Sequence, residues 1–442
     1  MTLTTSRALD HLLRATGDPI ADLSPITPGQ REFPRAQTLR AAVGVLAKVP
    51  DALPLVAQAI HAPEDLALSE RERAHRAAAA AWLAGNPVLA AESYAFILAR
   101  WPRDLLALRL AQSCYFFLGW HDRLCDIVDS VVHAWSRDRR GFGFLLAMAS
   151  FAHAENGNTA HAEALGREAL ARDPACPLGV HAVAHAFAES GRHAGGAQWM
   201  REQRAHWATE SRMCTHNAWH LAMFDIEEGD LASAVSILDH WLIPASAQSQ
   251  LDACDAAALL WRLAGEGLDD DGRWRRVSDA FEKTVTPGFW PYIDLHAALA
   301  HGSAGHHARL ARLVERIESR ATGNDYAAPR ALHITLPGLR ALTAWSQGRY
   351  HEAAITFSRI RPLLYRAGGS RVQLEIFSSI EAEAARRHER AERLPSRSTS
   401  TTERARTPRE IEVIDAEFSD VRQARTRATR DEAPRATTLT TA

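Results

Sequence analysis

Regularly spaced glycines constrain the fold of this chain more than any other feature of its sequence. They close Ala- and Leu-rich segments with helical apolar spacing, and another such segment begins a few residues after each glycine. A glycine that ends one helix just before the next is typical of an antiparallel helix pair. The pattern predicts seven or eight such hairpins, stacked so that each buries its apolar face on its neighbours. The glycines are Gly85, Gly119, Gly157, Gly191, Gly229, Gly265, Gly305 and Gly348, at intervals of 34, 38, 34, 38, 36, 40 and 43 residues.

Several units carry further features of a tetratricopeptide repeat. Gly157 is followed by Ala162, Ala169 and Pro174, which puts small residues where two helices approach and a proline after the second helix. Ala, Leu and Arg dominate the composition, and all three are strong helix formers. We therefore predict an all-α chain, an α-solenoid of divergent tetratricopeptide-like helical hairpins.

Breaks in this pattern divide the chain into three predicted parts. Residues 1–35 contain four prolines and are expected to form an irregular N-terminal lead-in with a short helix. Residues 36–390 form the solenoid. Residues 391–442 are rich in Ser, Thr and Arg, cannot bury enough apolar surface to fold, and are predicted to be a disordered tail. Residues 410–418 (EIEVIDAEF) within it are either a short docking strand for a partner or a chance apolar cluster.

Charge and missing motifs exclude several classes of function. The net charge of −2 creates no field for nucleic acid or an anionic membrane, and Glu and Asp are mixed among the arginines of the tail. No segment approaches about 20 uninterrupted apolar residues, and the N-terminus lacks the pattern of a signal peptide. Five isolated cysteines favour free thiols. We expect a cytoplasmic protein without a nucleic-acid or membrane partner, and the sequence contains no GK[ST] loop, HExxH or GxSxG motif.

Two His-x-x-x-His pairs stand out in the middle of the array, His181 with His185 and His216 with His220. The members of each pair are one helical turn apart and share a face of their helix, and Glu227 lies three turns along the face of His216. The pairs are 35 residues apart, whereas the glycines that end their helices are 38 apart, so the pairs sit at different heights in their repeats. Neighbouring helices lie about 8–10 Å apart. Their imidazoles can therefore converge, and the four histidines are candidate ligands of a divalent metal.

Further polar residues follow the histidines. Asp255 and Arg262 are seven residues apart, two turns of an otherwise apolar helix. Burying either charge alone is expensive, which implies a partner or a ligand. Asp294 and His296 place another carboxylate and another imidazole at the start of a later helix. We therefore predict that these four residues line one cavity together with the two histidine pairs.

Three interpretations of this polar set remain open. The side chains satisfy one another in a wet interior, bind a peptide or small ligand without chemistry, or form a metal-assisted or His-based catalytic site. Seven tryptophans crowd into residues 199–290 and either fill the core or wall a pocket.

The same stretches resemble the tetratricopeptide repeat protein 38 family. The matching segments are RDLLALRLAQSCYFFLG, AEALGREALARDP, HAVAH, HNAWHLAMFDIEEGD, DAAALLWRL, DLHAALA and GGSRVQLEIF, in order over most of residues 75–390. The resemblance implies a solenoid of divergent repeats but no established activity. The chain departs from the family's pattern at Ala218, where Trp is usual, at Arg371, where His is usual, and at Leu374 and Glu375, where Arg and Asp are usual. The recurring polar residues of the family fall here on His181, His185, His216, His220, Asp255, Arg262, Asp294 and His296.

Together these features favour a scaffold that binds a peptide or small ligand in a concave groove lined by His and Trp. The alternative is an enzyme that uses the His/Asp cluster for metal-assisted or general-base hydrolysis of a small substrate. A stoichiometric divalent metal would favour the enzyme.

Overall fold

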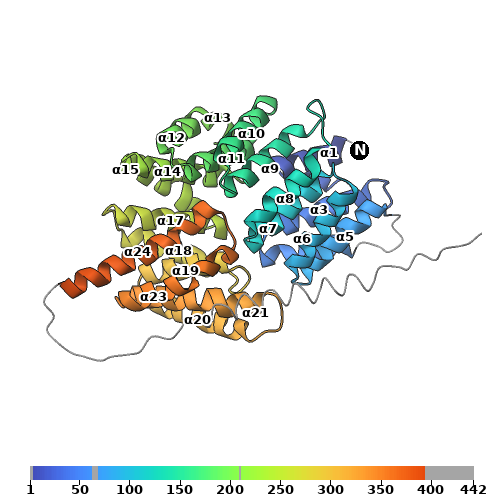
Figure 1. Ribbon diagram of the computed structural model, residues 1–442. Helices are drawn as coiled ribbons and strands as arrows, with labels where there is room; N and C mark the ends of the chain where they lie inside the picture. The colour runs from blue at the N-terminus through green and yellow to red at the C-terminus, as the bar shows by residue number, and fades with distance from the viewer. Residues whose placement is uncertain (1–2, 62–67, 209–210, 394–442) are drawn as a thin grey trace, which may run out of the picture. The chain divides into compact units, whose positions relative to one another are not determined.

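The computed structural model describes residues 3–61, 68–208 and 211–393. In these ranges every regular element is a helix, apart from one isolated bridge between Thr16 and Ser211. Eight antiparallel helix pairs form the body of the chain (Figure 1), which confirms the predicted all-α array of helical hairpins. The pairs are α5 (Glu70–Leu83) with α6 (Pro87–Arg100), α7 (Leu105–Leu118) with α8 (His121–Val132), α9 (Phe142–Glu155) with α10 (Thr159–Arg172), α11 (Pro177–Glu189) with α12 (His193–Glu202), α14 (Cys214–Glu227) with α15 (Leu231–Ile237), α17 (Gln250–Gly265) with α18 (Asp271–Thr284), α19 (Pro291–Ser303) with α20 (His307–Ala321), and α22 (Leu336–Ser346) with α23 (Tyr350–Ile360).

Glycines make the turns between paired helices. Seven of the eight predicted glycines have φ between 66° and 81°. This left-handed backbone conformation carries little steric cost in a residue without Cβ, so glycine ends a helix there readily. In the sixth pair the predicted position is two residues early. Gly265 is still the last residue of α17, and Gly267, with φ of 84°, makes the turn.

Shorter elements precede the array and link its later pairs. The first 35 residues contain α1 (Leu3–Arg14), α2 (Pro19–Leu23) and the start of α3 (Phe33–Ala47). The predicted tail lies outside the described residues, except that residues 391–393 end the last helix. The remaining elements are η1 (Pro50–Ala52), α4 (Leu53–Ile60), α13 (Arg204–Trp207), η2 (Leu238–Leu242), α16 (Ile243–Ser246), α21 (Ala327–Arg330), η3 (Ala331–Thr335), η4 (Arg361–Ala367) and α24 (Arg371–Arg393).

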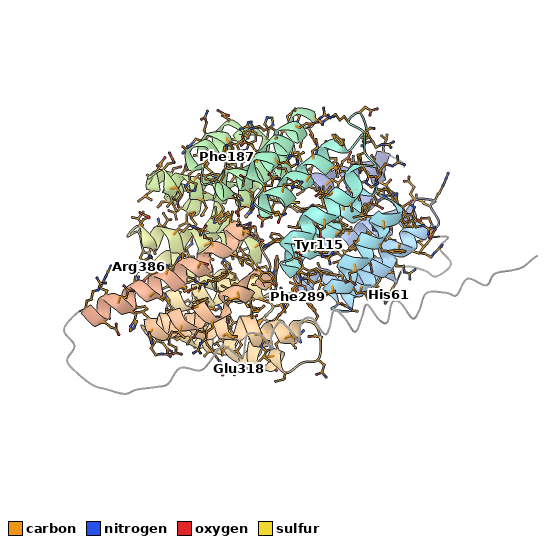
Figure 2. The ribbon with its side chains drawn as sticks, in the orientation of Figure 1. His61, Tyr115, Phe187, Phe289, Glu318 and Arg386 are labelled. Carbon is orange, nitrogen blue, oxygen red and sulfur yellow. The ribbon has the colours of Figure 1, made fainter. Side chains whose placement is uncertain are left out.

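The first helices of successive pairs pack on one another in sequence order, α9 on α11, α11 on α14, α14 on α17, α17 on α19 and α19 on α22. Small residues allow close approach, as where Ala154, Ala162 and Ala186 form one buried cluster. Large rings fill the wider gaps, and Trp219 and Trp290 are fully buried. Side chains occupy the space between the helices (Figure 2). Each pair thus buries its apolar face on its sequence neighbours, which is the packing of a helical solenoid.

The segment between η4 and α24 departs from this nearest-neighbour packing and contacts the second helix pair. His121 Nε2 lies 2.8 Å from the carbonyl oxygen of Gly369, 248 residues later in the sequence. The buried Arg330 guanidinium donates to the carbonyl oxygens of Phe117 at 3.0 Å and Arg366 at 2.8 Å. These hydrogen bonds hold the start of α24 beside helices from the first half of the array.

None of the helices in the described part of the chain combines the length and apolar character needed to cross a membrane. All five cysteines are free. Cys214 is half-buried and the other four are buried. Cysteine in such surroundings acts as a small apolar residue of the core.

Candidate metal centre

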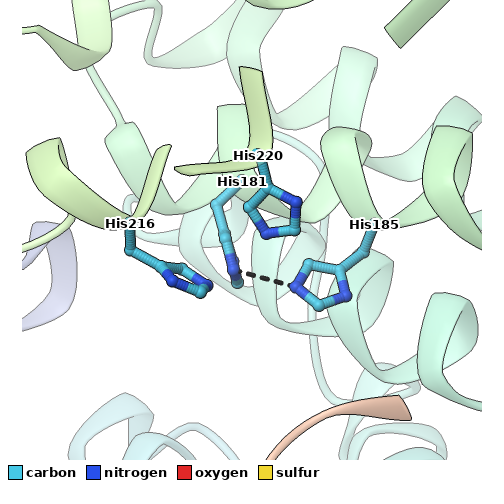
Figure 3. Close-up of side chains that lie close together, drawn as sticks. All are labelled: His181, His185, His216 and His220. Atoms are coloured by element: carbon cyan, nitrogen blue, oxygen red, sulfur yellow. Dashed lines mark hydrogen bonds between the residues drawn. The ribbon is translucent and has the colours of Figure 1, made fainter. Parts of the chain in front are cut away.

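The two histidine pairs meet where α11 packs on α14. One nitrogen from each of His181, His185, His216 and His220 lies within 4.8 Å of the others (Figure 3). The three-residue offset between the pairs is close to one helical turn, so the second pair keeps its face and shifts by only about 4.5 Å along the helix. The four imidazoles therefore converge even though the two pairs lie at different heights in their repeats.

Aromatic neighbours fix the orientation of the imidazoles. Phe151 of α9 stacks on His181 with ring centres 5.5 Å apart and meets His185 edge-on at 5.0 Å. Trp219 stacks on His216 at 5.2 Å with an angle of 12° between the rings. Rings held between other rings have few rotamers left to lose when a ligand binds, so the cluster is preorganised.

Two buried carboxylates stand behind the cluster. Glu155 Oε1 lies 2.9 Å from His185 Nδ1, and Asp255 Oδ2 lies 2.7 Å from His216 Nδ1. A carboxylate that accepts the Nδ1–H leaves the lone pair on Nε2, which then faces the centre. Carboxylates behind histidine ligands are common in metal sites, where they fix the tautomer and increase the basicity of the ligand.

The remaining two imidazoles lack such partners. His220 is 1% exposed, and neither of its ring nitrogens has a hydrogen-bond partner. His181 Nε2 lies 2.9 Å from His185 Nε2. Two nitrogen lone pairs at this distance repel unless a proton or a metal ion lies between them. An unpaired buried polar group costs about 1–3 kcal/mol, so His220 is an expensive residue to retain without a ligand.

Burial and charge set the protonation of the centre. Burial, reinforced by the neighbouring imidazoles, lowers the pKa of His181 and His220 well below the ordinary value. Burial acts in the same direction on His216, but the Asp255 carboxylate outweighs it and raises that pKa. Burial opposes ionisation of Glu155, but the nearby His185 ring outweighs burial and lowers the pKa of that carboxyl. Neutral imidazole beside an anionic carboxylate is the form in which histidine binds a metal.

A cavity of about 330 Å³ adjoins the centre, and His220 belongs to its wall. Arg262 of α17 lines it with a side chain that is 15% exposed, and its nearest carboxylate, that of Glu375, is 3.6 Å away. Glu189 at the end of α11 and Arg371 at the start of α24 add further charges to the wall. This volume is within the range of small-molecule sites.

The start of α24 joins this cavity to the carboxylates behind the histidines. The backbone N–H of Arg371 donates to Glu155 Oε2 at 2.9 Å, and Arg371 Nε lies 3.3 Å from Glu189 Oε2. Burial, together with the charge of Glu155, raises the pKa of Glu189 to about 7. Arg371, one of the positions where the sequence differs from the pattern it resembles, thus lies in the site itself.

The hydrogen bonds of Asp294 and His296 are made outside the four-histidine centre. The Asp294 carboxylate accepts the N–H of Gly288 at 3.1 Å, and burial raises its pKa to about 8. His296 Nδ1 lies 2.8 Å from the carbonyl oxygen of Tyr292 in its own helix, and its ring packs against Phe377 at 5.1 Å. Of the other six residues predicted from the sequence, four are the histidines of the centre, Asp255 lies behind His216, and Arg262 lines the adjoining cavity.

Glu155 and Glu189 were not among the residues predicted for the site. Each stands two residues before the glycine turn of its hairpin, as Glu227 does in the next unit. Equivalent positions of successive repeats project from equivalent points of neighbouring helices. This repeated glutamate is therefore the signal that could have revealed them. Glu227 itself lines the cavity and lies 3.3 Å from His193.

No family model matches the chain, so its resemblance to the tetratricopeptide repeat protein 38 family stays a prediction. Three solved structures have a partly similar helical arrangement. A Rap protein complexed with competence and sporulation factor has 12% identity and a TM-score of 0.42, over 87% of this chain and 98% of that one. The human IFIT1 dimer with PPP-AAAA has 14% identity and a TM-score of 0.44, over 88% of this chain and 93% of that one. A chain of the APC/C hetero-tetramer Cut9–Hcn1 has 15% identity and a TM-score of 0.40, over 86% of this chain and 69% of that one. None of these likenesses says what this chain binds.

Proposed function

We propose that this chain is a helical-repeat protein whose four clustered histidines hold a divalent transition-metal ion. The supporting observation is the set of four imidazole nitrogens within 4.8 Å of one another. Ligands about 2.1 Å from a tetrahedral zinc ion lie about 3.4 Å apart. Side-chain movements of about an ångström therefore complete such a site. Imidazole suits zinc, copper, nickel and iron, whereas magnesium and calcium prefer oxygen ligands.

The adjoining cavity supports binding of a small polar molecule beside the metal. His220 belongs to both the centre and the cavity, so a ligand in the cavity would lie beside the metal site. Arg262, Arg371, Glu189 and Glu375 give the wall charges of both signs. The volume of about 330 Å³ favours a small ligand over a peptide. We therefore propose that the ligand-binding scaffold predicted from the sequence binds a small molecule with the help of a metal ion.

Metal analysis of the purified full chain tests this proposal. We expect about one zinc ion per chain by mass spectrometry after zinc loading and desalting. Glu155→Gln and Asp255→Asn are each expected to weaken zinc binding about 10- to 100-fold, because loss of a carboxylate behind a histidine ligand has effects of this size. Competition with a fluorescent chelator measures the affinities.

His240→Ala serves as the control, because His240 is exposed and its Nδ1 lies 2.8 Å from the carbonyl oxygen of Ser236, one turn earlier in the chain. It should leave zinc affinity unchanged. Wild-type protein that retains no zinc, nickel, copper or iron after loading would contradict the metal centre. Equal weakening by His240→Ala would mean that surface histidines bind the ion.

Metal-assisted hydrolysis is a second candidate, favoured by the position of Glu189. Its carboxylate lines the cavity, its side chain is 10% exposed, and Arg371 holds it at 3.3 Å. In a hydrolytic step, Glu189 would accept the proton of a water molecule that attacks the substrate in the cavity. The other ionisable groups of the cavity wall are His193, His220, Glu227, Arg262 and Glu375, and the Glu155 carboxylate lies behind Arg371.

If the chain is a hydrolase, its kcat/KM for small ester or phosphoester substrates should rise with pH through about 7, the pKa of Glu189. Deprotonation makes the carboxylate a base, so activity is present above this pH and lost below it. Glu189→Gln should lower the rate about 100-fold or more and remove the rise, while zinc stays bound. The metal-loaded protein with its pH–rate profile is the measurement, and metal binding without turnover leaves the binding scaffold as the function.

A further inference from the structure

A second cavity, of about 460 Å³, shares no wall residue with the metal centre or its cavity. It lies among α1, α3, α5, the first turn of α7 and the loop between α8 and α9. Cations dominate its wall. The charged residues there are Arg35, Arg71, Arg103, Arg139 and Arg140, against Asp104 and Asp138.

Asp104, the buried carboxylate of this wall, already has hydrogen-bond and ion-pair partners. Asp104 Oδ2 lies 2.9 Å from His75 Nε2 and 3.3 Å from Arg71 Nε, and Asp104 Oδ1 accepts the N–H of Ala107 at 3.0 Å. Although burial acts against ionisation, the hydrogen bond and charge of His75 lower the pKa of Asp104 to about 2. Asp104 therefore has little capacity left to neutralise the other guanidinium groups.

Three of the arginines have no carboxylate within ion-pair distance in the described part of the chain, namely Arg35, Arg103 and Arg139. Arg35 Nε is buried and has no hydrogen-bond partner. Burial and the neighbouring guanidinium of Arg71 lower the pKa of Arg35, and they outweigh the nearby carboxylates of Asp104, Glu72 and Glu32, which act in the opposite direction. Arg140 differs, since it forms an ion pair with Asp10 at 2.7 Å. The wall thus holds an excess of fixed positive charge and a buried N–H donor with no acceptor.

We propose that this cavity binds a multiply charged phosphate group, such as the di- or triphosphate of a small molecule. Guanidinium groups match phosphate oxygens with paired N–H donors, and several of them together suit an anion with more than one charge. The first turn of α7, through Leu105 and Leu106, lines the same cavity. The N-terminus of a helix adds partial positive charge, although the Asp104 carboxylate already accepts the Ala107 N–H there. Leu9 and Trp135 supply apolar wall for the organic part of the ligand.

Titration calorimetry of the full chain with tripolyphosphate, at low and physiological salt, tests this site. We expect one tripolyphosphate per chain and an affinity that falls as salt rises, since charged contacts are screened. The double variant Arg103→Gln/Arg139→Gln is expected to weaken binding at least 10-fold. Both side chains are exposed, so the variant should keep the melting temperature of the parent.

Arg137→Gln is the matched control. Arg137 belongs to the same loop but lies outside the cavity wall, with Nε 3.8 Å from Glu168. Unchanged binding in this variant supports a built site. Equal weakening by Arg137→Gln, or binding without defined stoichiometry, would overturn the proposal in favour of diffuse attraction. Tighter binding of single-stranded RNA with a 5′-hydroxyl end than of tripolyphosphate would also overturn it, because the ligand would then be a nucleic-acid backbone.

Discussion

Replacing His220 with phenylalanine is expected to abolish zinc binding without destabilising the metal-free protein. Both ring nitrogens of His220 are buried without a hydrogen-bond partner. Phenylalanine keeps a flat ring in that space and removes an unpaired polar group whose burial costs about 1–3 kcal/mol. The metal-free variant should therefore be as stable as the parent or more stable. Its increase in stability on adding zinc, about 4 kcal/mol for the parent at free zinc 1,000-fold above Kd, should be absent.

Denaturant unfolding with a chelator and with saturating zinc measures both effects. His185→Phe provides the contrast, because His185 Nδ1 faces the buried Glu155 carboxylate at 2.9 Å. Removing that partner leaves Glu155 with the Arg371 N–H and the more distant His121 ring, so its buried charge is only partly satisfied, which costs about 1–3 kcal/mol. The two substitutions should thus abolish zinc binding alike but differ in the stability of the metal-free chain. A large loss of stability in metal-free His220→Phe would show that His220 is a structural residue.

The fold was predictable because its main determinant is local. A hairpin of helices needs a residue with positive φ at its turn, and glycine marks that position in the sequence. Gly265, the one predicted glycine that does not make the turn, shows the limit of this reasoning. Gly265 and Gly267 both stand near the end of α17, and the helix continues through the first of them. The helix end is set by turn geometry that the spacing of glycines does not resolve.

The histidine pairs were predictable for the same reason, since residues four apart share a helical face. Their supporting groups were not. The contact between Glu155 and Arg371 joins residues 216 positions apart and depends on the return of the segment before α24. The neighbours of His296 were not predictable either. Its Nδ1 faces the carbonyl oxygen of Tyr292 in its own helix. Periodicity identifies the helix and its face but not the neighbour that the face meets.

The segment between η4 and α24 contacts the second helix pair, and we call this the return contact. It depends on a close approach of two backbones at Gly119. A Cβ on Gly119 would lie 1.8 Å from the carbonyl oxygen of Tyr365 and 2.7 Å from its carbonyl carbon. Both neighbours are backbone atoms, so no side chain can rotate away to relieve the clash. Gly119→Ala is therefore expected to destabilise the protein by about 5 kcal/mol or more, at the upper end of what single substitutions do.

Gly85→Ala separates this clash from the strain of the turn. Gly85 has φ of 71° and Gly119 has φ of 72°, but nothing lies within 4 Å of a Cβ built on Gly85. Its replacement should cost only the left-handed conformation, about 1–2 kcal/mol. Equal costs for the two variants in denaturant unfolding would show that the return contact is not made.

Gly119→Ala also tests how the return contact serves the metal centre. To relieve the clash, the backbone at Tyr365 must move, and Gly369 and Arg371 follow it in the chain. Movement there lengthens the hydrogen bond from the Arg371 N–H to Glu155, the carboxylate behind His185. Zinc affinity should therefore fall in Gly119→Ala, at a temperature where the variant is still folded, and stay unchanged in Gly85→Ala. Unaltered affinity in both variants would mean that Glu155 is held in place by its own helix, without help from α24.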